Sequence, residues 1–491
     1  MINQPFLTEK EVCFFGGKPL LIYDFMPELR SEHDFLGTLD VPAEAYWGIH
    51  TQRAAANFPI SGLRVNPALI KSLALVKKAC CLANYETGHL GSAKANAIIT
   101  ACEEIAAGRL MSQFPLDALQ GGAGTSTNMN MNEVIANRAI EISGGRKGDY
   151  AIIHPLEDVN MHQSTNDVYP TAVKIAAIYS LRQLAAAVAD LQGAFQQKEK
   201  EFSTIVKIGR TELQDAVPIT LGAEFSAFAE AFSRDRWRTF KCEERLRVVN
   251  IGGTAVGTGL TAPRGYIFLV NEKLRDVTGI GLARGENVPG ETAHADSFVE
   301  VSGIINAHAV NLMKIAGDLR LMNFLGEIKL PQLQAGSSIM PGKVNPVLME
   351  AAIQTGIKVA ANDTIITATA ARGNLQINEF LPLLAHALLE SLDLLINIDE
   401  LMAVHIKGIT AGREKCQEYF EHSPLIITAF LPVIGYEKAT ELMTEFTSTG
   451  KKNMREFLEA KLGKTLVEKI FSSASLTALG YRDHGKNTEK Q

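Results

Sequence analysis

Long apolar stripes with helical spacing constrain the fold of this chain more than any other feature. In the first stripe, apolar residues recur at alternating intervals of three and four positions: Leu181, Leu184, Val188, Leu191 and Phe195. Two further stripes have related helical spacings: Ile304, His308, Leu312, Ile315, Leu319 and Met322, and then Leu384, Leu388, Leu392 and Leu395. A long helix with such a stripe must bury it against other helices. The pattern therefore predicts an all-α protein built around an up-and-down bundle of long helices.

Several of the predicted helices carry apolar residues on more than one side. Residues 351–371 are an example, and they are rich in small residues. A helix that is apolar on most sides is buried on most sides. In a bundle of this size, such a helix indicates neighbours that come from other subunits.

The central pattern is bounded by stretches of different character. No strong periodicity precedes Leu36, and from about residue 419 the pattern shortens and is interrupted by Pro424, Pro432 and Gly435. We therefore predict an N-terminal extension, an N-terminal helical domain, a central long-helix bundle and a small C-terminal helical domain, at residues 1–30, 31–165, 166–418 and 419–491.

The overall composition is that of a soluble globular protein. The 491 residues carry a formal net charge of -6, which argues against a nucleic-acid or anionic-membrane partner, because these need a basic face. No uncharged apolar stretch approaches the ~20 residues that span a bilayer, and Glu9, Lys10 and Glu11 interrupt any secretory signal. The six cysteines include no Cys-x-x-Cys pair and no metal-ligand spacing. We therefore expect reduced thiols, no bound metal and a cytoplasmic location.

Polar segments punctuated by glycine lie between the predicted helices, and residues 336–346 are the most informative of them. This segment combines Ser337, Ser338, Lys343 and Asn345 with two glycines and two prolines. Hydroxyl, amide and ammonium donors on one restrained loop suit a carboxylate ligand. A serine-rich turn that caps a helix and carries a surface lysine explains the same residues, so spacing alone leaves both interpretations open.

Three other segments offer neutral hydrogen-bond donors. Residues 121–128 are rich in glycine, serine and threonine, which suits either an anion held by backbone N–H groups or a flexible turn before a helix. Residues 163–167 place four uncharged donors before a carboxylate, where a single such residue would be enough to cap a helix. In residues 209–218, we expect Arg210 and Asp215 to pair and brace the loop.

Together, these four segments indicate a site for a small dicarboxylate that works without a metal ion. Other enzyme classes lack their motifs in this chain. There is no Gly-x-Ser-x-Gly nucleophile elbow, no dinucleotide-binding fingerprint after a strand, and no Gly-Lys-Ser/Thr after the glycine-rich segment. Hydrolase and dehydrogenase interpretations therefore lack the residues that they need.

The segment from Gly336 to Pro346 resembles the highly specific signature of the fumarase/aspartase superfamily, and the resemblance extends from about Asp34 to about Phe471. Further segments match in the same order: 120–134, 159–171, 209–218 and 252–260. Four segments look more like aspartate ammonia-lyases than class II fumarases: 120–126, 213–218, 330–334 and 407–411. The resemblance implies a homotetramer of three-domain subunits with a central helical core and no cofactor. Its active sites would combine loops from three subunits.

The resemblance also implies roles for individual residues. By match with the family, Ser337 removes a proton from the substrate carbon next to one carboxylate, and that carboxylate takes up the charge in an aci form. The matching donors to this carboxylate are Thr125, Ser164, Thr165 and Ser338. The other carboxylate would be held by Thr211, Lys343 and Asn345, with Asn166 near the leaving amine. The implied reaction is the reversible elimination of ammonia from L-aspartate to give fumarate.

The sequence departs from the family pattern at Glu212, where the family usually has His or Gln near the leaving group. With Glu350 at the position of a family glutamate, two carboxylates would face each other and favour an amine larger or more cationic than ammonia. Residues 321–331 form a shorter stretch than usual, and Thr261 and residues 154–157 also differ. Three alternatives stay open: a C–N lyase for an N-substituted aspartate or other amine, a fumarate hydratase, and a non-catalytic structural homologue.

Overall fold

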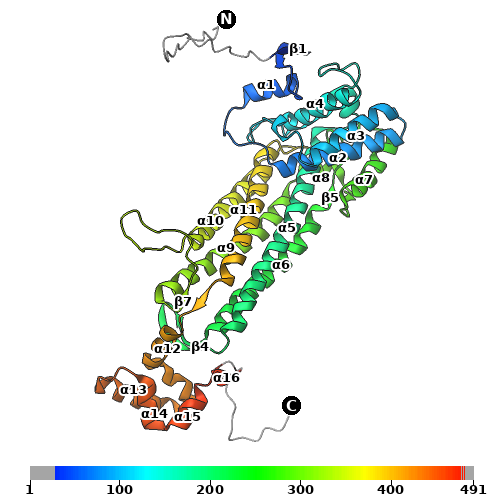
Figure 1. Ribbon diagram of the computed structural model, residues 1–491. Helices are drawn as coiled ribbons and strands as arrows, with labels where there is room; N and C mark the ends of the chain where they lie inside the picture. Colours follow the sequence, from blue (N-terminus) through cyan, green and yellow to red (C-terminus); the bar gives the residue numbers. More distant parts are fainter. Residues whose placement is uncertain (1–27, 477, 479, 481–491) are drawn as a thin grey trace, which may run out of the picture.

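The long helices of a central bundle dominate the computed structural model, which describes residues 28–476, 478 and 480 (Figure 1). Five helices form this bundle: α5 (Thr165–Glu201), α6 (Leu221–Cys242), α9 (Asp296–Leu325), α10 (Val347–Ala370) and α11 (Leu381–Lys407). Helix α5 packs along α6 and α11, and α10 packs along α9 and α11. The prediction of an all-α protein with a long-helix bundle is confirmed.

The apolar stripes predicted from the sequence form the core of the bundle. The whole first stripe is buried in α5, and the ring of Phe195 packs against Phe225 and Phe232 of α6. Leu312 of α9 and Leu392 of α11 are fully buried as well. Burial of each such side chain stabilises the fold by roughly 1.5–3 kcal/mol. Long continuous stripes therefore commit these segments to one bundle.

The second stripe brings one charged residue into the core. His308 of α9 lies between two buried carboxylates, with Nδ1 3.1 Å from Asp235 Oδ2 on α6 and Nε2 2.9 Å from Asp399 Oδ2 on α11. Burial opposes a charge on the imidazole, but the attraction of both carboxylates outweighs it and raises the pKa of His308 to about 10. This buried ion triad therefore links the buried faces of α6, α9 and α11 in the bundle core.

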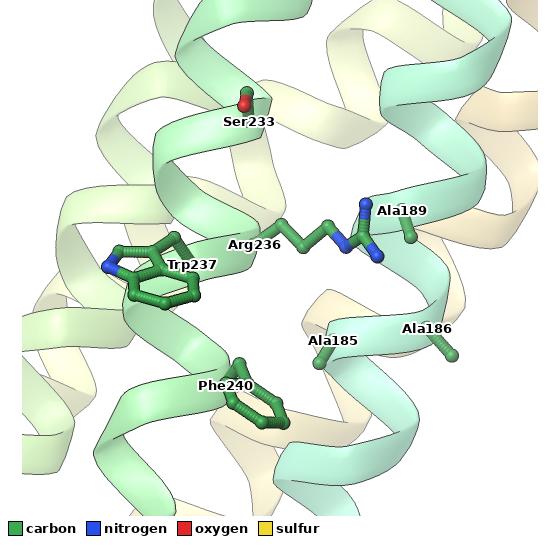
Figure 2. Close-up of a pocket in the computed structure, with 7 residues that line it drawn as sticks. All are labelled: Ala185, Ala186, Ala189, Ser233, Arg236, Trp237 and Phe240. Atoms are coloured by element: carbon green, nitrogen blue, oxygen red, sulfur yellow. The ribbon is translucent and has the colours of Figure 1, made fainter.

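An open groove runs between α5 and α6 on the surface of the bundle (Figure 2). It has a volume of about 690 Å³, and alanines of α5 line it opposite Arg236, Trp237 and Phe240 of α6. Trp237 and Phe240 are each 63% exposed, and their stacked rings lie 6.3 Å apart. Exposed apolar patches of this kind mark interaction surfaces.

A group of smaller elements packs at one end of the bundle (Figure 1): β1 (Leu29–Asp34), β2 (Gly37–Pro42), α1 (Ile49–Asn57), α2 (Pro67–Glu86), α3 (Ser92–Ala106) and α4 (Thr125–Ile142). The two strands form an antiparallel hairpin, and α2 packs against both α3 and α5. Most of the predicted N-terminal extension, residues 1–27, lies outside the described residues, whereas Leu29 and Arg30 belong to β1.

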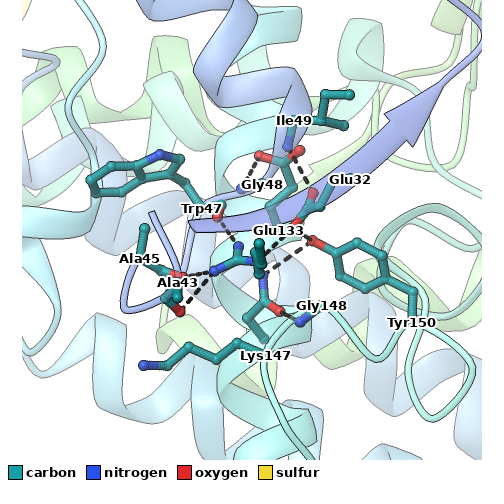
Figure 3. Close-up of polar contacts among 12 residues, drawn as sticks. Glu32, Ala43, Ala45, Trp47, Gly48, Ile49, Glu133, Lys147, Gly148 and Tyr150 are labelled. Carbon is teal, nitrogen blue, oxygen red and sulfur yellow. Dashed lines mark hydrogen bonds and ion pairs between the residues drawn. The ribbon is translucent and has the colours of Figure 1, made fainter. Parts of the chain in front are cut away.

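A buried polar cluster fixes the start of α1, as Figure 3 shows. Glu133 of α4 accepts backbone N–H groups at 2.8–3.1 Å from three residues at this start: Gly48, His50 and Thr51. Glu133 thereby replaces the side-chain cap that Gly48 lacks. A Cβ atom at Gly48 would lie 2.6 Å from Glu32 Oε2, so the position between the two carboxylates has room only for glycine.

Short strands and helices lie between the bundle helices or directly after the last of them: β3 (Val206–Thr211), β4 (Gln214–Thr220), β5 (Val248–Val249), α7 (Arg264–Thr278), β6 (Ala283–Arg284), α8 (Val288–Ala293), β7 (Ile328–Lys329) and β8 (Thr410–Ala411). Strands β5 and β6 pair in parallel, and the other pairs are antiparallel. The polar segment 209–218, expected from the sequence as a loop, is largely the β3–β4 hairpin. Its two strands pair from Val206 and Thr220 up to the tip.

The opposite end of the bundle carries five short helices: α12 (Arg413–His422), α13 (Leu431–Thr449), α14 (Met454–Leu462), α15 (Lys464–Ile470) and α16 (Ser473–Leu476). Four of them, α12 to α15, pack with the 3-10 helix η4 (Pro424–Phe430) around an apolar cluster of their own that is rich in phenylalanine: Phe420, Phe430, Phe446, Phe457 and Phe471. The domain limits drawn from the sequence stay a prediction.

Two of the bundle helices, α5 and α11, are long and apolar enough to span a bilayer by length and composition alone. In each, 67% of the most apolar window is buried inside the protein. The apolar character of these helices is accounted for by their place in the bundle core.

Candidate active site

The predicted site residues form three groups that a single chain does not bring together. The helix-end cluster comprises residues 120–128 and 160–167, around the points where α4 and α5 begin. The hairpin tip comprises residues 211–214 between β3 and β4, and the signature loop comprises residues 336–346 before α10. In Figure 1 the β3–β4 hairpin lies at the end of the bundle remote from α4, and the chain between β7 and α10 projects sideways from the bundle.

The start of α4 is held by a glycine that rests on α5. Helix α4 begins at Thr125, directly after Gly124, which has a φ of 94°. A Cβ atom at Gly124 would lie 2.5 Å from the ring of Tyr169 on α5. Thr125 is exposed, and its hydroxyl donates to the carbonyl oxygen of Gly122 at 2.7 Å. The glycine-rich segment therefore ends in a helix start that is packed against α5 rather than in a flexible turn.

The start of α5 is a capping box. Ser164 Oγ accepts the N–H of Asn166 at 3.2 Å, and Asp167 Oδ1 accepts the N–H of Ser164 at 3.1 Å. Asn166 donates its side-chain amide to the carbonyl oxygen of Ala255 at 2.7 Å, and Asp167 Oδ2 accepts the N–H of Thr254 at 2.9 Å. The run of polar residues thus caps the helix and also ties it to the loop before α7.

The starts of α4 and α5 meet, because Asn128 Nδ2 donates to Thr165 Oγ1 at 3.1 Å. The first turn of a helix has N–H groups without intrahelical partners and carries the positive end of the helix dipole. Two such helix starts side by side favour an anion, and a carboxylate fits this field. Ser164 and Thr165 at the start of α5 therefore lie next to the first turn of α4, which begins at Thr125.

A buried lysine lies beneath the helix-end cluster. Lys77 of α2 donates to Asn160 Oδ1 at 2.9 Å and to Gln163 Oε1 at 2.8 Å, and burial lowers its pKa to about 8. Asn160 Oδ1 also accepts from Asn128 Nδ2 at 3.3 Å and from Asn132 Nδ2 at 3.1 Å. Lys77 was not among the residues predicted from the sequence, although a lysine inside the apolar run of α2 is the signal that marks it.

The hairpin tip is a two-residue turn of unusual composition. Thr211 pairs with Gln214, so Glu212 and Leu213 form the turn, with φ angles of 53° and 62°. Two consecutive positive φ angles normally call for Asn and Gly, because larger side chains are strained there. Thr211, Glu212 and Leu213 are all exposed. The strain and the exposure together indicate a tip whose shape serves contacts outside its own chain.

Ion pairs brace the strands behind this tip. Arg210 Nε lies 3.4 Å from Asp215 Oδ1, as expected from the sequence. Arg210 Nη1 also lies 2.5 Å from Glu327 Oε1, and Lys207 Nζ lies 2.6 Å from Glu327 Oε2 in the protein interior. The buried Glu327 next to β7 therefore anchors β3.

In the signature loop, the side chain of Ser337 stabilises a turn by accepting backbone N–H groups. Ser337 Oγ accepts the backbone N–H groups of Ile339 at 3.2 Å and Met340 at 3.0 Å. The N–H of Gly336 donates to the carbonyl oxygen of Lys343 at 2.7 Å, and Asn345 Nδ2 donates to the carbonyl oxygen of Gly336 at 3.0 Å. Backbone N–H groups that point at the serine oxygen stabilise negative charge on it.

The tip of the signature loop is strongly apolar for a projecting segment. Ile339 is 84% exposed and Met340 is 48% exposed. Leu333, in the chain that leads into the loop, is 54% exposed. Lys343 is exposed as well. Contiguous exposed apolar side chains indicate a surface that another protein surface covers.

Two other segments singled out from the sequence have local partners. Glu350, in the first turn of α10, lies 3.7 Å from Arg320 Nη2 of α9, whereas Glu212 is exposed at the hairpin tip. Residues 154–157 open a short π-helical turn, η2 (Pro155–Val159). His154 Nδ1 accepts the N–H groups of Leu156 at 3.1 Å and Glu157 at 3.2 Å.

Comparisons of sequence place the chain among known lyases. A family model described as lyase matches residues 37–361. An aspartate ammonia-lyase of Bacillus sp is 45% identical over 430 residues, which cover 86% of this chain and 92% of that protein. An aspartate ammonia-lyase of Escherichia coli (strain K12) is 43% identical over 464 residues, which cover 92% of this chain and 97% of that protein.

Solved structures share the fold over nearly their full length. The structure of a fumarate lyase:delta crystallin from Brucella melitensis, bound to cobalt, is 45% identical with a TM-score of 0.87, and the match covers 91% of this chain and 99% of that chain. A recombinant class II fumarase from Schistosoma mansoni is 30% identical with a TM-score of 0.85, covering 91% of this chain and 98% of that chain. The chain therefore belongs to the fumarase/aspartase superfamily of lyases.

Proposed function

We propose that this protein is an aspartate ammonia-lyase, which reversibly eliminates ammonia from L-aspartate to give fumarate. Relatives that are 43–45% identical over most of the chain carry that name. The observation that carries the proposal is the geometry of the signature loop, in which the Ser337 oxygen accepts two backbone N–H groups. This arrangement suits a serine that acts as a base.

Serine is a weak base, so Ser337 must become alkoxide-like before it can take a proton from carbon. The N–H groups of Ile339 and Met340 stabilise that charge at distances of 3.2 and 3.0 Å. Lys343, on the same loop, supplies a positive charge nearby. The alkoxide then removes a proton from Cβ of aspartate and becomes a neutral hydroxyl. This hydroxyl gives the proton up to solvent before the next turnover, which restores the base.

The electron pair of the broken C–H bond moves into the adjacent carboxylate, which becomes an aci form with one additional negative charge. Preorganised hydrogen-bond donors around this carboxylate lower the barrier, because they bind the more highly charged aci form more strongly than the carboxylate of the bound substrate. We assign this role to Thr125, Ser164 and Thr165 of the helix-end cluster, together with Ser338. The electron pair then forms the C=C bond as the Cα–N bond breaks, and the ammonium group leaves as ammonia beside Asn166.

The second carboxylate of the substrate needs its own partners, and Thr211, Lys343 and Asn345 fit this role. These residues belong to the hairpin tip and the signature loop, which lie apart from the helix-end cluster in one chain. We therefore propose a homotetramer in which each site takes the three groups from different subunits. The exposure of Ile339 and Met340, at 84% and 48%, supports coverage of the signature loop by a neighbouring subunit.

The groove between α5 and α6 supports the same self-association (Figure 2). Its α5 side is lined by Ala185, Ala186 and Ala189, whose small side chains let a neighbouring helix approach closely. The stacked Trp237 and Phe240 offer a large apolar area opposite these alanines. Aromatic residues of this kind dominate the binding energy of protein interfaces.

The direct test is to incubate the purified protein with L-aspartate and to measure both fumarate absorbance and released ammonia. The wild-type protein should produce the two in equal amounts. Ser337→Ala should lower kcat by roughly 10³-fold or more while the tetramer stays intact. Turnover of malate without turnover of aspartate would identify a fumarate hydratase. A folded tetramer inactive on both would indicate a non-catalytic structural homologue.

A second candidate activity is a C–N lyase that acts on an N-substituted aspartate. Glu212 favours it, because an exposed carboxylate follows Thr211 directly at the strained hairpin tip. A carboxylate near the leaving group attracts a larger or more cationic amine, and Glu350 is the second carboxylate proposed there. Glu212→Gln should lower kcat/KM for N-substituted aspartates relative to aspartate. If the ratio of kcat/KM for N-substituted aspartates to kcat/KM for aspartate is unchanged, Glu212 does not determine which amine the enzyme accepts.

We also propose that the enzyme is soluble and cytoplasmic and has no nucleic-acid or membrane partner. The formal net charge of -6 disfavours both kinds of anionic partner. Helices α5 and α11, which are long and apolar enough to span a bilayer, are largely buried by packing in the bundle core.

A further inference from the structure

Lys77 is a fully buried lysine whose direct partners are neutral. Its ammonium group donates to Asn160 Oδ1 at 2.9 Å and Gln163 Oε1 at 2.8 Å. Among residues 28–476, no carboxylate forms an ion pair with it, and the field of the buried Asp167 reaches it only from a distance. Burying a charge without a paired countercharge costs free energy. A lysine at this position therefore needs a reason beyond packing.

The ammonium group determines how the amide of Asn160 is turned. An ammonium group has three donors and no acceptor, so Asn160 must present Oδ1 to Lys77. The Nδ2 atom of Asn160 then faces the carbonyl oxygen of Gln163, at 3.3 Å. With its oxygen turned inward, Asn160 is an acceptor for its neighbours, and both Asn128 and Asn132 donate to it.

The orientation of Asn160 also determines which hydrogen-bonding role Thr165 takes, through Asn128. Asn128 uses one amide hydrogen on Asn160 Oδ1 at 3.3 Å, and its Nδ2 also donates to Thr165 Oγ1 at 3.1 Å. Thr165 Oγ1 therefore acts as an acceptor on its buried side. Within the described part of the chain, the Thr165 hydroxyl hydrogen has no protein acceptor, so it is free to point away from Asn128.

We propose that Lys77 is a positioning residue for catalysis. It fixes the amides of Asn160 and Asn128 so that the hydroxyl of Thr165 is always a donor toward the substrate carboxylate. This inference rests on the proposed function, in which Thr165 binds the aci-carboxylate. Lys77 does not touch the substrate, and it acts through two intervening side chains.

The orientation matters because a threonine hydroxyl can donate or accept with equal ease. A hydroxyl that accepts from Asn128 has its hydrogen available for an anion at all times, so no reorganisation is needed when charge develops. Two buried amide oxygens, Oδ1 of Asn128 and Oδ1 of Asn132, are left without a hydrogen-bond partner in the described structure. The amide donors of this network are thus hydrogen-bonded, whereas two of its acceptors are not. Such an arrangement is expected where it serves function rather than stability.

The test is steady-state kinetics of Lys77→Met on L-aspartate, beside Thr165→Val and the double variant. Methionine keeps the length of the side chain and removes the charge and the donors. We expect Lys77→Met to lower kcat and kcat/KM equally, by roughly 10- to 100-fold, with KM nearly unchanged. The double variant should be no slower than the slower single variant, because both changes remove the same interaction.

Asn128→Leu tests the same link without touching the lysine, and it keeps the experiment informative if Lys77→Met does not fold. It should show the same loss of kcat, with no further loss when Thr165→Val is added. Lys198→Met is the matched control, because Lys198 is also a buried lysine but pairs with Glu201 at 2.7 Å. Its kcat should equal that of the wild type.

The possible results distinguish a failure of the proposed lyase activity from a failure of the positioning role of Lys77. A wild-type protein that does not release fumarate from aspartate would refute the proposed function. A wild-type protein that is active, together with folded Lys77→Met or Asn128→Leu variants that keep full kcat, would refute the positioning role alone. Losses of Lys77→Met and Thr165→Val that multiply in the double variant would also refute it.

Discussion

The backbone N–H of Gly336 donates to the carbonyl oxygen of Lys343 at 2.7 Å and closes the base of the signature loop. Asn345 reinforces this closure with its side-chain amide, which donates to the carbonyl oxygen of Gly336 at 3.0 Å. The closed base holds Ser337 and Lys343 on one turn. The spacing of the signature segment is thereby explained by the geometry of a single loop.

Gly336→Ala should disable this loop without unfolding the protein. A Cβ atom at Gly336 would lie 2.9 Å from both Asn345 N and Lys343 O, and these backbone atoms cannot rotate away. The loop must therefore open, and a shift of about 1 Å at Ser337 costs up to roughly 10²-fold in kcat. Gly281→Ala is the control, since a Cβ there meets nothing within 4 Å. Equal kcat values for the two variants would show that loop closure is not needed.

Gly48→Ala should lower stability rather than activity. The new Cβ would lie 2.6 Å from Glu32 Oε2 and 2.9 Å from Glu133 Oε1, inside the cluster that caps α1 (Figure 3). Overpacking of this kind costs about 1–3 kcal/mol of unfolding free energy, which denaturant curves measure. Gly91→Ala is the matched control, because Gly91 also precedes a helix but has nothing within 4 Å of its Cβ position. If both variants are equally stable, the cluster tolerates a methyl group.

The buried triad around His308 should make stability depend on alkaline pH. The pKa of His308 rises from 6.5 to about 10 on folding, so the folded protein binds this proton more tightly than the unfolded chain. The triad's contribution is complete below about pH 6.5 and is lost as the pH rises through about 10. The unfolding free energy of the wild type, measured against that of His308→Gln, should therefore fall across this window.

The His308→Gln variant itself should be less stable at neutral pH. Asp235 and Asp399 would face each other in the core without their cation, which costs roughly 3–5 kcal/mol. The comparison of the two proteins removes the contributions of other titrating groups. A difference in stability that stays constant from neutral pH to pH 10 would contradict a charged His308.

Trp237→Glu should weaken self-association. Trp237 is 63% exposed in one chain and lines the groove between α5 and α6 (Figure 2), where a charge would oppose burial against a second subunit. Sedimentation velocity should show smaller species than for the wild type, which we propose to be a tetramer, and activity should fall with them. Phe268→Glu is the control, because Phe268 is 58% exposed on α7, outside the long-helix bundle. A Trp237→Glu tetramer as stable as the wild type would exclude the groove as an interface.

The bundle could be predicted from the sequence because helical periodicity records which side chains are buried. The five-residue stripe that starts at Leu181 maps directly onto the core face of α5. The same pattern placed His308 in the interior, but it could not identify Asp235 and Asp399 as its partners. Those residues lie on other helices, and only tertiary packing brings them within 3.1 Å of the imidazole.

The residue types indicate the candidate site segment by segment, whereas the way the segments combine across subunits comes from the family resemblance. The residue types near Thr125, Ser164 and Ser337 pointed to anion binding, because hydroxyl and glycine-rich loops have recognisable chemistry. The hairpin around Thr211 was expected as a loop, since Gly209 and Pro218 interrupt the alternation that marks a strand. A lysine within the apolar run of α2 marks Lys77 as unusual, but its partners could not be predicted, because they depend on which amides pack against it.

Subunit mixing tests the central claim most directly, namely that the Ser337 loop and the Thr211 hairpin tip act in one site from different subunits. Ser337→Ala and Thr211→Val tetramers should each be nearly inactive on L-aspartate. After both are dissociated, mixed and reassembled together, fumarate release should recover substantially, because some sites then receive an intact loop from one variant and an intact tip from the other. If mixed tetramers form and activity does not rise above that of the separate variants, the two groups act within one chain or not in one site, and the account is wrong.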